Sequence, residues 1–163
     1  MQLAAASPAP GRVNLQGKQG RYTASVQVPV SAQKAWSVLT NYESMAGVMP
    51  DIQQAKVVSR SGRSLELAQT YQAPYTFGQR IKARLRVQET APSQMSYELI
   101  SGDRIKKLQG TWTITPVKGG VIVKHQIELV PEIPGFLIGT YYDLTEANLR
   151  QSMQILAKLM LKG

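Results

Sequence analysis

Apolar and polar residues alternate along the middle of the chain. From Asp51 onward a period of two continues for about eighty residues, interrupted only by turns of Gly, Pro, Asp and Ser. With a similar stretch near the start, this pattern predicts seven strands, at residues 21–28, 53–60, 64–72, 79–90, 94–101, 104–116 and 121–130. Because short turns join most of these strands, we expect hairpins and therefore an antiparallel sheet.

The end of the chain follows a helical period instead. Within residues 135–162, one apolar face consists of Ile138, Tyr142, Thr145, Leu149, Met153, Leu156 and Met160. A helix of this length would be on the order of 40 Å long. Residues 31–41 and 42–48 predict two short helices after the first strand.

The long helix is the only apolar surface large enough to cover the apolar side of the sheet. The predicted fold class is therefore α+β, with a curved seven-stranded antiparallel sheet wrapped around the terminal helix. One helix cannot contact the whole concave face, so we expect a gap between the two. Residues 1–20 show no period and are rich in Ala, Pro, Gly and Gln, which predicts a disordered arm before a single domain at 21–163.

Charge adds a possible partner to this picture. The chain carries 19 Lys and Arg against 10 Asp and Glu, a formal charge of +9. Such an excess suits an anionic partner such as phospholipid head groups, nucleic acid or a ribosomal surface, and it also simply keeps a protein in solution. No apolar run approaches the roughly 18 residues that a membrane span needs.

A basic row and an aromatic loop lie next to each other in the sequence. The row consists of Arg80, Lys82, Arg84 and Arg86, on the outward face of a predicted strand. It would suit an anionic membrane surface, although such a row is more often a solvated strand face. The loop at 73–78 carries Tyr75 and Phe77, and it predicts a lid over a pocket mouth, a membrane contact, or a loop packed on its own sheet.

His125 is the first candidate for chemistry. It shares a strand face with Val123 and Ile127, so it is either a ligand contact and general acid/base or a core histidine bonded to a backbone group or a Tyr. We favour the core interpretation, because no acid is visibly paired with it. The same ambiguity applies to the aromatic residues Tyr71, Tyr75, Phe77, Tyr97 and Trp112.

Known catalytic motifs are missing from the sequence. There is no P-loop, dinucleotide fingerprint, nucleophile elbow or zinc signature. The absence of Cys excludes thiol catalysis and disulfides, and a single His leaves zinc without its usual ligands. The motifs therefore indicate neither catalysis nor a metal.

Three strings carry a resemblance to a known family. They are VPVSAQKAWSVLTNYESMAGVMPDI at 28–52, LQGTWTITP at 108–116 and GGVIVKHQIELVPEIPGFL at 119–137. With the long final helix, their order and spacing resemble the START-like (SRPBCC) superfamily, also called the polyketide cyclase and coenzyme Q-binding group. The resemblance covers about residue 21 to the end, and it implies the helix-grip fold.

The resemblance also implies a function. Members hold a lipid, quinone, sterol-like or polyketide molecule in a cavity between sheet and helix, and the coenzyme Q-binding (COQ10-like) branch looks nearest and needs no cofactor. That branch includes proteins described as ribosome-association toxins. Polyketide aromatases and cyclases share the fold and need polar groups deep in the pocket, which His125 with Tyr71, Tyr97 or Tyr141 could supply.

We therefore favour a non-enzymatic carrier or chaperone of a hydrophobic small molecule. The alternatives are a cyclase or dehydratase with His125 as acid/base, and a basic module that binds ribosomes or membranes through the basic row. We expect a cytoplasmic monomer, with contact at an anionic membrane surface as an option and without nucleic acid as a partner. The expected ligand-binding residues are Tyr71, Tyr75, Phe77, Leu85, Tyr97, Trp112, Val123, His125, Tyr141, Leu144 and Asn148.

Overall fold

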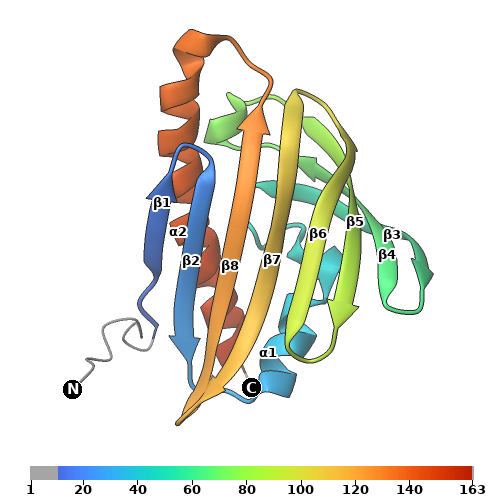
Figure 1. Cartoon of the computed structure of the whole chain (residues 1–163), viewed down its shortest axis with the longest axis vertical. Coiled ribbons are helices and arrows are strands. Elements are labelled where there is room, and N and C mark those ends of the chain that lie inside the picture. The colour runs from blue at the N-terminus through green and yellow to red at the C-terminus, as the bar shows by residue number, and fades with distance from the viewer. Residues whose placement is uncertain (1–10, 163) are drawn as a thin grey trace.

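An antiparallel sheet curves around one long helix (Figure 1). The structure, a computed structural model, describes residues 11–162. The sheet has eight strands in the order β1-β2-β8-β7-β6-β5-β4-β3. The strands are β1 (Asn14–Lys18), β2 (Arg21–Val28), β3 (Ile52–Ser61), β4 (Ser64–Tyr71), β5 (Ile81–Thr90), β6 (Gln94–Gly102), β7 (Ile105–Val117) and β8 (Gly120–Pro131).

The helices lie where their periods predict them. Two short ones, α1 (Ala32–Leu39) and η1 (Tyr42–Met45), follow β2, and α1 is capped by Ser31, whose hydroxyl accepts from the Lys34 amide at 3.0 Å. One turn, η2 (Pro74–Thr76), lies in the loop between β4 and β5. At the end, η3 (Gly135–Leu137) leads into α2 (Ile138–Leu161), which runs along one side of the sheet in Figure 1.

The helix-grip arrangement is thus confirmed, and the strand count is corrected from seven to eight. The additional strand is β1, which pairs with β2 from Asn14↔Ser25 to Lys18↔Arg21. It lies in the stretch predicted as a disordered arm, of which residues 1–10 fall outside the described part of the chain. Its residues are half-buried or exposed, so backbone pairing holds this edge strand and no alternating pattern marks it.

The core lies between the concave face of the sheet and α2. Alternate residues of β5 and β8 are buried, as the period of two predicts, among them Leu85, Val87, Val121 and Val123. They pack in one cluster with α2 residues such as Met153. Among the described helices, none is both long and apolar enough to cross a membrane.

Candidate functional site

A cavity of about 470 Å³ separates the sheet from α2. Side chains from β4 to β8, η1, η2 and α2 line it, and most of them are apolar. Pockets that hold small molecules have roughly 300–1,000 Å³ and a similar composition. The predicted gap between helix and sheet is therefore present, and it is large enough for a ligand.

Most of the predicted ligand-binding residues lie on the wall of this cavity. They are Tyr71, Tyr75, Phe77, Leu85, Tyr97, Trp112, His125, Tyr141 and Asn148. Val123 and Leu144 do not line it. Val123 is fully buried in the core, and Leu144 lies one residue, about 100° of helix rotation, from the stripe of α2 that Thr145 and Asn148 present to the cavity.

Two aromatic side chains, Trp112 and Tyr97, contact the His125 ring. Its ring stacks on that of Trp112, its cross-strand partner on β7, with centroids 3.9 Å apart and planes at 8°. The Tyr97 hydroxyl lies 2.6 Å from Nε2 of His125, a hydrogen-bond distance. The structure thus shows the Tyr contact considered in the core interpretation of His125.

Burial determines the charge of this group. His125 is 7% exposed, and burial lowers its pKa from 6.5 to about 3, so its imidazole is uncharged at neutral pH. Burial also raises the pKa of Tyr97 well above its usual value. The pair is a neutral polar group on a wall that is mostly apolar.

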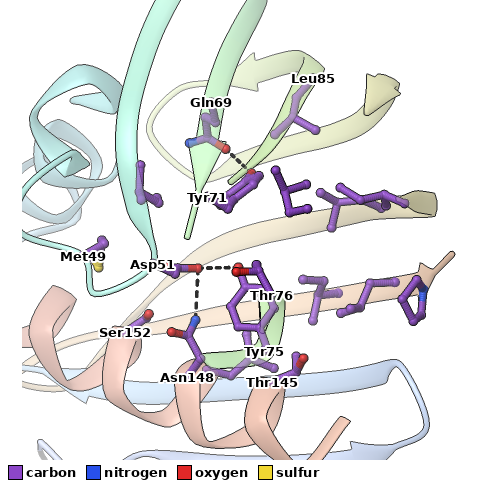
Figure 2. Close-up of a pocket in the computed structure, with 18 of the residues that line it drawn as sticks. Met49, Asp51, Gln69, Tyr71, Tyr75, Thr76, Leu85, Thr145, Asn148 and Ser152 are labelled. Atoms are coloured by element: carbon purple, nitrogen blue, oxygen red, sulfur yellow. Dashed lines mark hydrogen bonds between the residues drawn. The ribbon is translucent and has the colours of Figure 1, made fainter. Parts of the chain in front are cut away.

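The sequence did not point to the second polar group, which is centred on Asp51. Its Oδ2 accepts from the Tyr75 hydroxyl at 2.9 Å and from Nδ2 of Asn148 at 3.1 Å (Figure 2). Asp51 is 9% exposed and lines the cavity, and burial raises its pKa. The sequence pattern shows no acid paired with His125, and the buried acid of this wall is bonded to Tyr75 and Asn148 instead.

Distance along the chain explains why Asp51 was missed. It follows Met49 and Pro50 just before β3, where an aspartate has the local pattern of a turn. Its partners are 24 and 97 positions away, in η2 and α2. Only the packing of η2 and α2 against the start of β3 brings the three together.

Further polar atoms lie near Asp51. The Tyr71 hydroxyl donates to Gln69 on the same strand, and both residues line the cavity. Thr145 is 5% exposed, and within the described chain its Oγ1 has no hydrogen-bond partner. Figure 2 shows Thr145, Asn148 and Ser152 along the part of α2 that borders the cavity. This end is thus richer in polar groups than the surrounding apolar wall.

The loop at 73–78 closes one side of the cavity. Tyr75 points inward, where its ring meets that of Tyr141 edge-on with centroids 5.9 Å apart. Phe77 lies at the wall with 39% of its surface exposed. The Thr76 hydroxyl fastens the turn through hydrogen bonds with the Ala73 backbone, at 2.9 and 3.0 Å.

Lys82, Arg84 and Arg86 of the basic row lie on the exposed face of β5, away from the cavity, and Arg80 is exposed just before this strand. Arg84 pairs with Glu66, and Arg86 pairs with Glu98 at 3.4 Å. Exposed pairs of this kind contribute little stability, but they reduce the net positive charge of the row. Between residues 11 and 162, no group of three or more His, Cys, Asp or Glu is placed to hold a metal ion.

Comparisons with known proteins agree with this geometry. A family model described as polyketide cyclase / dehydrase and lipid transport matches residues 28–154. No curated protein matches the chain.

Solved structures share the fold at low sequence identity. A START superfamily protein from Mycobacterium smegmatis is 20% identical, with a TM-score of 0.65 over 83% of this chain and 95% of that one. The Zhui aromatase/cyclase from Streptomyces sp. R1128 is 12% identical, with 0.69 over 90% and 94%. A STAR-related lipid transfer protein from Xanthomonas axonopodis is 16% identical, with 0.69 over 92% and 92%.

Proposed function

The chain belongs to the polyketide cyclase / dehydrase and lipid transport family, and on that premise we propose that it binds and carries a hydrophobic small molecule. The ligand class is a lipid, an isoprenoid quinone or a polyketide-like compound. The observation that carries this proposal is the apolar cavity of about 470 Å³ between the sheet and α2. A cavity of this size in a domain core costs stability unless something fills it.

Affinity would come mainly from burial of the ligand's apolar surface. At roughly 25 cal/mol per Å², burying on the order of 300 Å² would supply about 7 kcal/mol before ordering costs are subtracted. The few polar groups on the wall would then orient the polar end of the ligand.

Solvent extraction of the natively purified protein, followed by mass spectrometry, tests the proposal. We expect a lipid, quinone or related compound in stoichiometric amount. Trp112→Ala and His125→Ala, which alter the wall, should reduce its retention, whereas Lys124→Ala, at an exposed position on β8, should not. Retention that neither wall variant changes would contradict this placement of the ligand.

A cyclase or dehydratase is the second candidate, favoured by the Tyr97–His125 contact inside the cavity. A neutral imidazole beside a bound poly-ketone could accept a proton during enolisation, although a pKa of about 3 makes it a weak base. His125→Asn should then abolish turnover of a poly-β-ketone substrate while binding persists. Full turnover by this variant would remove His125 from the mechanism.

We also propose a peripheral contact with an anionic membrane during loading or delivery. Phe136, in η3, is 85% exposed and lies between Pro134 and Leu137, which line the cavity. Such an exposed aromatic ring beside an opening suits the bilayer interface. The fraction of protein that cosediments with anionic vesicles should fall with added salt and after charge reversal at Arg84 and Arg86. If neither treatment changes this fraction, the basic row takes no part in membrane binding.

A further inference from the structure

The buried carboxylate of Asp51 has no charged partner. None of the ion pairs found within residues 11–162 includes it, and its two hydrogen-bond donors, Tyr75 and Asn148, are neutral. The other charged residues of the wall, Arg104 and Glu132, are exposed. An unpaired carboxylate in an apolar cavity is costly, because desolvation is not offset by an opposite charge.

The Asp51 carboxylate can accept further hydrogen bonds. An ionised carboxylate has about four lone-pair sites, and the two donors both bond to Oδ2. Asp51 also lines the cavity rather than being sealed behind it. A ligand in the cavity can therefore meet an acceptor that is already oriented by two hydrogen bonds.

A second polar group lies on the same part of the wall. Thr145 is three residues before Asn148 on α2, so the two side chains lie on one face of the helix. The Thr145 hydroxyl is buried and lines the cavity, and among the described residues it meets no group in good hydrogen-bond geometry, although it lies near enough to the Tyr141 hydroxyl to oppose the rise in the pKa of Tyr141. Buried hydroxyls are normally hydrogen-bonded in good geometry, so Thr145 can take a further polar partner from the cavity.

We propose that Asp51, held by Tyr75 and Asn148, is the head-group site of the cavity and binds a hydrogen-bond donor, a hydroxyl or a protonated amine, at the polar end of an amphiphilic ligand. Thr145 is the second contact of that head. A protonated amine would offset the charge of ionised Asp51, whereas a carboxylate head, as in a fatty acid, would meet a like charge or require Asp51 to hold a proton. This inference rests on the proposed carrier function and narrows its ligand class.

The net charge of the protein would by itself favour a different ligand head from the one proposed for Asp51. A formal charge of +9 attracts anions in general. A preference for alcohols and amines over carboxylates would therefore oppose the overall field, and it would have to come from a local group. Asp51 is that group.

Three ligands with the same 12-carbon chain provide the test: dodecanol, dodecylamine and dodecanoate. Their dissociation constants are measured near pH 7.5, below micelle-forming concentrations, by displacement of a fluorescent apolar probe. We expect wild-type protein to bind the amine at least roughly tenfold more tightly than the carboxylate, with the alcohol between them, because only the ammonium can form a charge-assisted hydrogen bond that also offsets the buried charge of Asp51. This ranking needs no variant.

Two variants test whether Asp51 causes the preference among the three ligands. Asp51→Asn should bring the amine and the carboxylate to within about threefold of each other. Glu98→Gln, which removes an exposed acid, should keep the wild-type ranking.

The outcomes separate this inference from the function on which it rests. Equal binding of all three ligands by wild type, or a ranking unchanged in Asp51→Asn, would overturn the head-group site while the carrier function stands. If neither the probe nor any ligand binds to wild type, the carrier function fails, and the head-group site with it.

Discussion

His125 is the only histidine in the chain, so its protonation can be followed without interference from another imidazole. Burial lowers its pKa in the folded protein from 6.5 to about 3. The unfolded chain therefore takes up a proton as the pH falls below 6.5, whereas the folded protein does not until about pH 3. Stability linked to His125 is fully present above pH 6.5 and is lost as the pH falls toward 3.

The size of the effect follows from the two pKa values. Between about pH 7.5 and pH 5, protonation of the unfolded state alone should lower the free energy of unfolding by about 2 kcal/mol. For a chain of this size that corresponds to roughly 4–8 °C in Tm. His125→Asn has no imidazole, so the difference between the two proteins isolates this effect and cancels other titrating groups that both contain.

Two measurements check this prediction. Urea unfolding of wild type and His125→Asn at several pH values should give curves of stability against pH that converge toward pH 5, as wild type loses its advantage. The Hε1 resonance of the single imidazole should not shift between about pH 8 and 5. A midpoint near the ordinary value of 6.5, with parallel stability curves, would refute the reasoning.

Two further predictions concern backbone space and buried charge. Gly110→Ala should destabilise the fold by about 1–3 kcal/mol, because its Cβ would lie 2.5 Å from Oη of Tyr97 and 2.6 Å from the Gln126 carbonyl oxygen. Gly139→Ala is the control: a Cβ there would have nothing within 4 Å, so this variant should be neutral or stabilising. Equal effects of the two variants in urea unfolding would contradict this prediction. The raised pKa of Asp51 means that the fold disfavours its ionised form, so wild type should lose stability as the pH rises from about 4 to 7.5. Asp51→Asn cannot ionise there and should therefore gain stability relative to wild type over this range. A difference in Tm between the two proteins that stays constant with pH would contradict this prediction.

The local periods in the sequence were enough to determine most of the architecture. Strand and helix periods follow from backbone geometry, so alternation placed His125 on the buried face of β8 with Val123, and the helical stripe placed Met153 in the core. The need to cover an apolar sheet face then determined that α2 lies against it. The edge strand β1 lacked this signal, because it is held mainly by backbone pairing with β2, and of its residues only Leu15 packs, half-buried, against the core.

The polar sites were decided by the tertiary structure. Asp51 looks like a turn residue in the sequence, and only the packing of η2 and α2 brings Tyr75 and Asn148 to its carboxylate. Tyr97 meets His125 across the sheet, where Gly110 leaves room for its side chain. A period records which face a residue occupies, but contacts between side chains far apart in the sequence depend on how the faces are assembled, and no local pattern carries that information.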